Sequence, residues 1–260
     1  MKINRRKFLK VSAIAVCAVA VGGGVVYTLS RDSDPLKDIY ESMEKVLATR
    51  FGQDRTSALM KDIQQEYQTL TLEVPSIGGE ESFFYEWQPM VVYFLAAYRV
   101  LKPLNQTVEQ VGKIIYETYE DVANHPKWLL RLIGSFKYDK GYIERLREAA
   151  TESQKRQYPE NWVCTFVEGD GEEFDYGFDM TECFVCKFYH ALGADELIPY
   201  ICLGDYAVSK AFDRGLVRYR TLAEGAEVCD FRYKKGRETF VYPLRDGWPP
   251  KFLNVKAGHS

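Results

Sequence analysis

Residues 181–235, TECFVCKFYHALGADELIPYICLGDYAVSKAFDRGLVRYRTLAEGAEVCDFRYKK, hold four of the six cysteines and one of the three histidines of the chain. The segment predicts two helices followed by a hairpin. Residues 182–192 have the length of a helix and end before Gly193, a residue that commonly terminates helices. A second helix is expected from a cap at Asp195 to about residue 212, because Pro199 would then lie in its first turn, where proline is tolerated.

The first of these helices carries three side chains that can bind a metal or act as nucleophile and base. Cys183, Cys186 and His190 follow the spacing i, i+3, i+7, which predicts that they share one side of the helix and point at one small volume. A second stripe with this spacing lies on the following helix: Cys202, Asp205 and Ser209. Each residue alone has a simpler explanation, because a free cysteine is often a small buried apolar residue and a single histidine is usually structural.

Alternating apolar residues predict two hairpins on either side of this helix pair. The expected strands are 162–168 with 174–180, joined by Gly169-Asp170-Gly171, and 216–222 with 226–233, joined by Ala223-Glu224-Gly225. The last strand places Cys229 and Asp230 on opposite faces. The order hairpin, two helices, hairpin predicts an α+β fold, with a helical N-terminal half packed on a small, mostly antiparallel sheet. If the first and last strands were neighbours, Cys164 would approach Cys229.

The N-terminal half shows helical periodicity. Helices are expected from Pro35, over 57–69, over 82–101, over 108–122 with a cap at Asn105, over 127–133 and over 142–155. The segment 82–101 is rich in aromatic residues and carries Glu86, which favours a buried central helix over a membrane span. The predicted regions are a signal or anchor at 1–30, a helical region at 31–158, an α+β catalytic or binding region at 159–242 and a tail at 243–260.

Three pieces of sequence, in order, resemble the L-2-amino-thiazoline-4-carboxylic acid hydrolase family. They are a Cys-x-x-Asp on a helix, a Thr-Leu-x-x-Gly turn and a closing Cys-Asp-Phe, here Cys202 and Asp205, then Thr221, Leu222 and Gly225, then Cys229, Asp230 and Phe231. The cysteine at the head of the preceding helix, Cys183, is also similar to the family, whereas Cys186 and the N-terminal signal are additional features. The resemblance is sharpest over the last third of the chain.

The resemblance implies hydrolysis of a small cyclic substrate at the carbon between nitrogen and sulfur, with opening of the ring. Cys202, Asp205 and Cys229 are the first candidates for catalytic residues because they lie in the shared motifs, followed by Cys183 and His190, with Asp230 in the closing motif. An alternative is a divalent metal that activates water, with Cys183, Cys186 and His190 as candidate ligands. One of Arg218, Arg220 and Arg232 would bind a substrate carboxylate, although each is more simply an exposed strand residue.

The N-terminus predicts export. Residues 4–10, NRRKFLK, match a twin-arginine (Tat) signal pattern, and an apolar stretch from Val11 to about Leu29 follows. This stretch nearly reaches the length of about 20 residues that spans a bilayer, so it is either a cleaved signal or a membrane anchor. In both cases the remaining chain would lie outside the cytoplasm, in the periplasm or on the outer face of the membrane, after handling by the Tat export machinery.

Composition and net charge limit the classes of molecule that the protein is expected to bind. The 260 residues are 46% hydrophobic and carry a net charge of -3, with no basic block outside the leader, which argues for a folded core and against nucleic-acid binding. A small molecule is the expected substrate. Two other functions remain open: a non-catalytic domain that binds a metal or small ligand, and a thiol redox protein built on Cys183 and Cys186. Reversible oxidation of Cys183 and Cys186 would favour the thiol redox protein over the ligand-binding domain.

Overall fold

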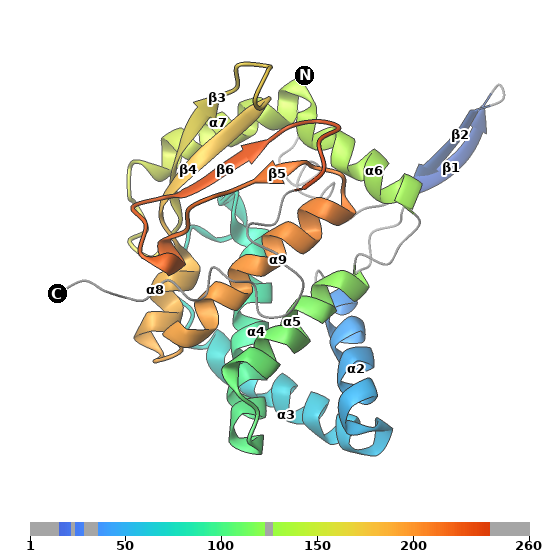
Figure 1. The fold of residues 1–260 in the computed structure, drawn as a ribbon, viewed down its shortest axis with the longest axis vertical. Helices are drawn as coiled ribbons and strands as arrows, with labels where there is room; N and C mark the ends of the chain where they lie inside the picture. Colours follow the sequence, from blue (N-terminus) through green and yellow to red (C-terminus); the bar gives the residue numbers. More distant parts are fainter. Residues whose placement is uncertain (1–15, 22–23, 29–35, 123–126, 240–260) are drawn as a thin grey trace.

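A four-stranded antiparallel sheet lies against helices in the computed structural model, which describes residues 16–21, 24–28, 36–122 and 127–239 (Figure 1). The helices of the N-terminal half are α2 (Lys37–Phe51), α3 (Gln53–Thr71), α4 (Gln88–Leu101), α5 (Val108–Val122), α6 (Lys127–Ser135) and α7 (Lys140–Ser153). The predicted α+β class, with a helical half packed on a small sheet, is therefore confirmed.

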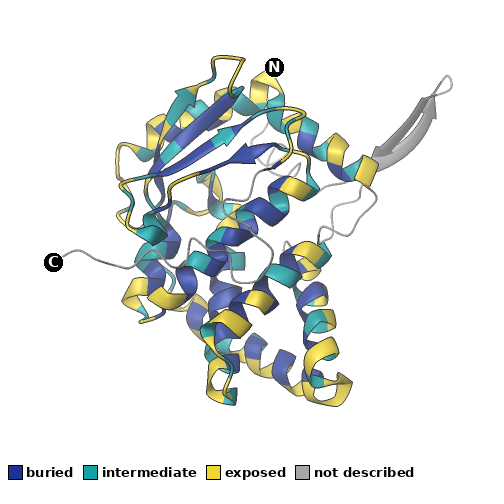
Figure 2. Ribbon diagram, viewed as in Figure 1, coloured by how far each residue is buried: buried dark blue, intermediate teal, exposed yellow. Residues whose placement is uncertain are grey.

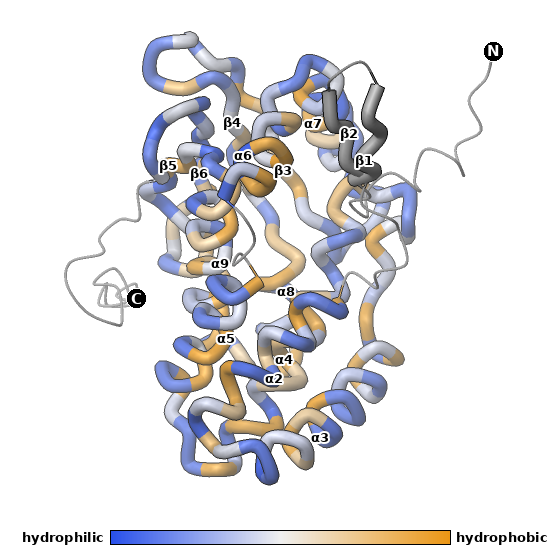
Figure 3. The backbone as a smooth tube through the Cα atoms, turned by 90° about the vertical axis from the view of Figure 1, so that its right-hand side faces the viewer, coloured by the Kyte–Doolittle hydropathy of each residue, from blue (hydrophilic) through white to orange (hydrophobic). Residues whose placement is uncertain are grey.

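The helix α4 forms the centre of the helical half. Its middle residues Phe94, Leu95 and Ala96 are 0% exposed, as an apolar helix surrounded by others requires. By contrast, α3 buries only one face. The tube in Figure 3 shows hydrophilic and hydrophobic residues alternating along this helix. Figure 2 shows buried residues along the strands and exposed residues on the outer turns of α2 and α3.

The start of one predicted helix and the cap of another were wrong. The helix expected over 82–101 begins at Gln88, because residues 79–81 and 85–87 form short 3-10 turns and Pro89 lies in the first turn of α4. Helix α5 is not capped by Asn105, which has a left-handed backbone with φ 61°. Thr107 caps it instead: its Oγ1 accepts the N–H of Gln110 at 3.2 Å, and the Gln110 side chain accepts the N–H of Thr107 at 2.8 Å.

Helix α5 packs closely on α9 (Ile198–Ala211) because each contributes a glycine where the other contributes a tyrosine. A Cβ atom at Gly204 of α9 would lie 2.3 Å from the ring of Tyr119, and one at Gly112 of α5 would lie 2.2 Å from the ring of Tyr200. Real Cβ atoms do not approach other atoms so closely. The two glycines therefore set the distance between the helices, and so the position of the residues that α9 carries.

The sheet contains β3 (Val163–Glu168), β4 (Tyr176–Glu182), β5 (Leu216–Val217) and β6 (Cys229–Tyr233), in the spatial order β3-β4-β6-β5. The face toward the helices carries the paired residues Tyr176 and Tyr233, Phe178 and Phe231, Met180 and Cys229. On the other face Arg232 pairs with Asp179 at 2.8 Å. Both predicted hairpins are present.

Strand β4 separates the first strand from the last. Cys164 of β3 pairs with Met180, and Met180 pairs in turn with Cys229 of β6. Two strand spacings, about 10 Å, therefore lie between the two cysteines. The approach of the two cysteines was expected only if β3 and β6 were neighbours, and this condition is not met.

The predicted strand 216–222 is much shorter in the structure. Pairing of β5 with β6 stops at Val217, and the carboxylate of Asp230 then takes the place of a strand partner. Its Oδ1 accepts the backbone N–H of Tyr219 at 3.0 Å and that of Arg220 at 2.7 Å. Residues 222–224 form a 3-10 turn that ends at Gly225, where φ is 83°.

The N-terminal apolar run is described in part. Strands β1 (Val16–Val21) and β2 (Gly24–Thr28) pair in an antiparallel hairpin. Within the described ranges, none of the helices has both the length and the apolar character needed to cross a bilayer. The twin-arginine residues Arg5 and Arg6 lie outside the described residues, as does the whole of the predicted tail at 243–260.

Candidate active site

Cys183 stands at the point where a strand becomes a helix. Strand β4 ends at Glu182, and Cys183, with an extended backbone of φ -127° and ψ 124°, is the N-cap of α8 (Phe184–Ala191). Its carbonyl accepts the N–H of Lys187 at 3.1 Å, the first bond of the helix. The helix ends before Gly193, whose φ is 67°, as the sequence predicted.

This position favours the thiolate of Cys183. The thiol of Cys186 lies beside its sulfur and lowers the pKa of Cys183, and the N–H groups of Cys186 and Val185 act in the same direction against the cost of burial. These N–H groups face the sulfur without completing a cap hydrogen bond. A helix N-terminus stabilises negative charge, so the geometry and the lowered pKa agree. Conversely, the neighbouring Cys183 sulfur and burial raise the pKa of Cys186, which keeps its proton.

The second helix begins later than predicted. Asp195 does not cap α9, because residues 195–197 form a 3-10 turn and α9 starts at Ile198 with Pro199 in its first turn. Asp195 instead accepts a bond from Nδ1 of His190 at 2.7 Å. Helix α9 ends at Ala211, one residue from the predicted end, and it carries Cys202 and Asp205 on the expected stripe.

Arg218 is the buried charge around which the site is arranged. It follows β5, is 2% exposed, and its guanidinium lies over the rings of Tyr206 at 4.8 Å and Phe231 at 4.7 Å. Its Nη1 donates to Asp205 at 2.6 Å and its Nη2 to the carbonyl of Cys202 at 2.8 Å. Arg218 therefore fixes both members of the Cys-x-x-Asp motif, and the expectation of an exposed strand arginine was wrong for this position.

The thiols of Cys202 and Cys229 are held in their neutral form. Burial raises the pKa of Cys202 well above its ordinary value and that of Cys229 to about 12, although the charge of Arg218 opposes both shifts. Cys229 also accepts the N–H of Leu222 on its sulfur at 3.1 Å. This bond connects the Thr-Leu-x-x-Gly turn to the Cys-Asp-Phe strand, so the two motifs form one local structure.

Four cysteines from α8, α9 and β6 lie close enough to influence one another's ionisation. Cys183 influences the ionisation of Cys186, Cys202 and Cys229, and the carboxylate of Asp205 opposes the ionisation of Cys183. Cys183, Cys186 and Cys202 are half-buried, and the side chain of Asp205 is 45% exposed. The thiols are thus partly exposed, and Asp205 joins the solvent-facing surface to the buried Arg218.

His190 does not join the cysteines. Its side chain is 79% exposed and pairs with Asp195 at the far end of α8. The spacing i, i+7 puts two residues on one side of a helix, but the rise of 1.5 Å per residue separates them by about 10 Å along the axis. Among the described residues, no group of three or more His, Cys, Asp or Glu side chains is placed to hold a metal ion. The predicted ligand set of Cys183, Cys186 and His190 does not converge.

Three other residues considered from the sequence have structural partners. Both oxygens of Asp230 face residues 219–220, with Arg220 Nε at 3.4 Å from Oδ2, and Asp230 is 7% exposed. Arg232 pairs with Asp179 on the far face of the sheet. These contacts organise the strands, and none of them leaves a group directed at the thiols.

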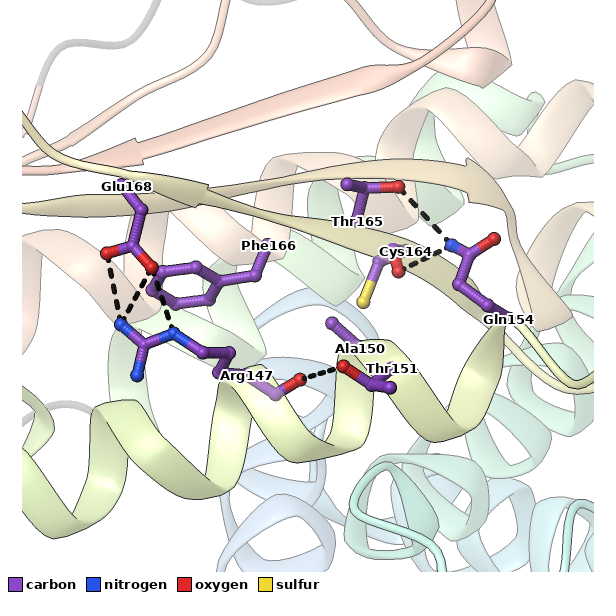
Figure 4. Close-up of a pocket in the computed structure, with 8 residues that line it drawn as sticks. All are labelled: Arg147, Ala150, Thr151, Gln154, Cys164, Thr165, Phe166 and Glu168. Carbon is purple, nitrogen blue, oxygen red and sulfur yellow. Dashed lines mark hydrogen bonds and ion pairs between the residues drawn. The ribbon is translucent and has the colours of Figure 1, made fainter.

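A groove of about 240 Å³ lies elsewhere, between α7 and β3 (Figure 4). Its walls are joined by their own contacts: Arg147 bonds both oxygens of Glu168 at 2.9 and 3.0 Å, and Gln154 donates to the carbonyl of Cys164 at 2.8 Å. Burial raises the pKa of Cys164 to about 11. The groove contains no thiolate and no unpaired charge, so the cysteine cluster is the stronger candidate for chemistry.

Sequence reasoning missed two buried residues, Arg218 and Gly204, that hold the site residues of α9 in position. Arg218 was one of three equivalent arginines in the sequence, and only the fold shows that it is buried beside Asp205. Gly204 lies between Cys202 and Asp205, and a glycine within a helix that carries polar residues was the available signal of close packing.

The region that contains this site matches a known protein family. Residues 90–233, from the start of α4 to the end of β6, match the model of the family described as L-2-amino-thiazoline-4-carboxylic acid hydrolase. The matched region is more than half of the chain, and the protein belongs to this family. It includes every residue of the cysteine cluster and also the helices α4 to α7, so the likeness extends well beyond the last third. No curated protein and no solved structure matches the chain.

Proposed function

We propose that the protein is a hydrolase that opens a small cyclic compound at a carbon bonded to both nitrogen and sulfur, with L-2-amino-thiazoline-4-carboxylate as the first substrate to test. The observation that supports this most is Cys183 at the N-terminus of α8, beside the thiol of Cys186 and near enough to Asp205 for the carboxylate to affect its ionisation, in a chain of this family. The proposal moves the nucleophile from Cys202, the first candidate from sequence, to Cys183.

The reaction follows from the protonation states of the two thiols. The Cys183 thiolate adds to the carbon between nitrogen and sulfur, and the ring C–N or C–S bond breaks as its leaving atom takes the proton of Cys186. Water then adds to the carbon, the thiolate leaves, and the proton released by water restores Cys186. The net change is substrate plus one water, with no oxidant or reductant.

Asp205 supplies the negative charge that a cyclic amidine requires. Its Oδ2 is bonded to Arg218, while its side chain remains 45% exposed. A protonated amidine has N–H groups on either side of its central carbon, and a carboxylate held by a buried arginine can accept from them without moving. In the second step the same carboxylate would accept the proton of the attacking water and pass it on to Cys186.

The test uses the full-length protein with its thiols reduced. It is incubated with 2-amino-thiazoline-4-carboxylate, and mass spectrometry follows the gain of one water by the substrate. We expect Cys183→Ser to abolish this gain and Asp205→Asn to reduce it strongly. Cys164→Ser is the matched control, since it makes the same substitution at a buried cysteine outside the cluster.

Each negative outcome has a definite meaning. Full activity in Cys183→Ser would overturn the assignment of the nucleophile and restore Cys202. No product from any cyclic amidine with intact, reduced protein would favour a non-catalytic domain that binds a small ligand or a metal. Loss of activity on dialysis against a chelator, restored by a divalent metal, would favour the metal-activated water instead.

A thiol redox protein is the second candidate, supported by the pair Cys183 and Cys186. A lowered pKa on the first cysteine, at a helix N-terminus, and a raised pKa on the second are the arrangement that dithiol oxidation uses. Here two thiols would give a disulfide and pass two electrons to a disulfide of a small thiol. Equilibration with oxidised and reduced glutathione distinguishes the two candidates: rapid, reversible conversion of this pair without ring-opening activity would favour the redox function.

Export by the twin-arginine route is also part of the proposal, supported by Arg5 and Arg6 in NRRKFLK and by the apolar stretch after them. The chain would act outside the cytoplasm, released or anchored by this stretch. The test is cell fractionation of the protein carrying Arg5→Lys and Arg6→Lys. We expect the variant to accumulate in the cytoplasm. An unchanged distribution would overturn the route.

A further inference from the structure

Helix α6 exposes large apolar side chains at the edge of the molecule (Figure 1). Trp128, Leu132 and Phe136 follow the spacing i, i+4, i+8, which lines them up along one side of α6 and the turn after it. They are 55%, 45% and 56% exposed. Single exposed apolar residues are common on protein surfaces, but three in a row along one helix form a patch that calls for an explanation.

The rest of the protein covers only part of the apolar surface of α6. Leu130 is buried, and Gly134 lies so close to α9 that a Cβ atom there would be 1.7 Å from the carbonyl oxygen of Phe212. Between this buried side and the exposed patch lie Leu129 and Ile133, which are half-buried. A helix that only packs on a core carries polar residues on its outer side. Helix α6 carries apolar residues there instead.

The segment that contains the patch is basic. Residues 127–147 include six lysines and arginines but two acidic residues, in a chain with a net charge of -3. Lys127 and Arg131 are exposed, and Arg131 lies about 60° around the helix from Trp128. Arg131 has a distant partner in Asp213 at 3.5 Å, and none of the ion pairs among the described residues includes Lys127. Exposed Trp, Leu and Phe beside Lys and Arg are the composition of helices that lie in a membrane interface.

The N-terminal apolar stretch joins the protein near α6. Lys45 of α2 pairs with Asp121 of α5 at 3.0 Å, and Arg50 of α2 pairs with Glu117, so the two helices run antiparallel. The start of α2 therefore lies beyond Asp121, at the end of α5 that leads to α6. If the stretch of residues 11–29 were held in a bilayer, it would keep this end of the protein close to the membrane surface.

We propose that α6 docks on the surface of a bilayer that contains anionic lipids. The side chains of Trp128, Leu132 and Phe136 would enter the boundary between headgroups and acyl chains. Lys127 and Arg131 would contact the lipid phosphates, with their aliphatic stems along the apolar patch. This contact is separate from the proposed ring opening, and the inference holds whether or not that reaction occurs.

The test uses the full-length protein with vesicles of phosphatidylglycerol brominated in the acyl chains, which quench the fluorescence of tryptophans that reach them. We expect quenching, and we expect Trp128→Phe to remove most of the quenched fluorescence. Trp87→Phe is the matched control and should leave the quenching unchanged. Trp87 is also exposed, but it packs on Phe84 and Trp162 and is not part of the patch on α6.

Two further variants keep Trp128 as the reporter. Lys127→Gln should lower the ratio of docked to undocked protein about fivefold, the contribution of one basic residue near an anionic membrane. Leu132→Asn should also reduce the quenching of Trp128, because it puts a polar group in the patch. Since both residues are exposed, neither substitution should disturb folding.

The experiment separates docking of α6 from insertion of residues 11–29 alone. Insertion of that stretch by itself would give the same quenching in Trp128→Phe as in the original protein, and this result would overturn the proposal. Equal quenching by brominated phosphatidylcholine would overturn the role of anionic lipid. A lipid-free dimer that Leu132→Asn converts to a monomer would also overturn it, because the patch would then be an interface between two copies of the chain.

Discussion

The guanidinium of Arg218 lies 2.6 Å from the carboxylate of Asp205, although 1% of the arginine side chain is exposed against 45% of the aspartate side chain. The ion pair therefore connects the interior of the protein with its surface. Because a buried charge without a partner is strongly destabilising, Asp205 stabilises the fold as well as influencing the ionisation of the thiols. The same residue is thus required for folding stability and for the proposed chemistry.

Replacing Asp205 by Asn should lower the free energy of unfolding by about 2 kcal/mol, because Arg218 loses a hydrogen bond to a charged acceptor. Urea unfolding measures this change. Asp195→Asn is the matched control, since the pair of Asp195 with His190 is exposed on both sides and should contribute less than about 1 kcal/mol. Equal effects of the two substitutions would contradict the role of Arg218 as a buried cation that depends on Asp205.

Replacing Cys186 by Ala should slow the alkylation of Cys183. The thiol of Cys186 is the largest influence that lowers the pKa of Cys183, so its removal should raise that pKa and leave less thiolate at pH 7. The rate of reaction with iodoacetamide should fall by about tenfold for each unit of pKa. Peptide mapping by mass spectrometry identifies the modified residue. Cys164→Ala should leave the rate unchanged, and an unchanged rate in Cys186→Ala would show that the helix N-terminus alone sets the thiolate.

Removing the thiol of Cys164 should make the protein less sensitive to alkali. Burial raises the pKa of this thiol from 9.0 to about 11, so the folded state keeps a proton that the unfolded state has lost. The stability from this group is complete below pH 9 and is lost as the pH rises through about 11, with a slope of about 1.4 kcal/mol per pH unit. Urea unfolding of the original protein and Cys164→Ala should therefore give curves that converge over this range. Parallel curves would contradict the burial of a neutral thiol.

Substituting Ala for Gly204 should destabilise the protein by about 1–3 kcal/mol, because the new methyl group collides with the ring of Tyr119. The shift of α9 should also displace Cys202 and Asp205, which lie on either side. Gly141→Ala, near the start of α7, is the control, since nothing lies within 4 Å of its Cβ position. It should stabilise the helix by about 0.5–1 kcal/mol, and thermal unfolding of both variants measures the difference.

The class of fold and the strands of the sheet could be predicted because alternation, turn residues and helix ends are local signals. The site was only partly predictable, because its key relationships are not local. The spacing of Cys183 and His190 puts both on one side of the helix, but it also separates them by about 10 Å along the axis, so the expected trio does not meet. Arg218 follows Asp205 by thirteen positions, and no periodic pattern connects them. The short strand β5 likewise results from the side chain of Asp230, a contact that strand propensity does not include.

The order of the strands prevents a disulfide between Cys164 and Cys229 once the chain has folded. Because Met180 lies between Cys164 and Cys229, the folded sheet holds these thiols farther apart than the limit of about 7 Å between Cα atoms that a disulfide permits. An unfolded chain has no such separation and can join them at random. Folding before oxidation therefore protects the cysteines, whereas oxidation before folding would trap cross-links that the native sheet forbids.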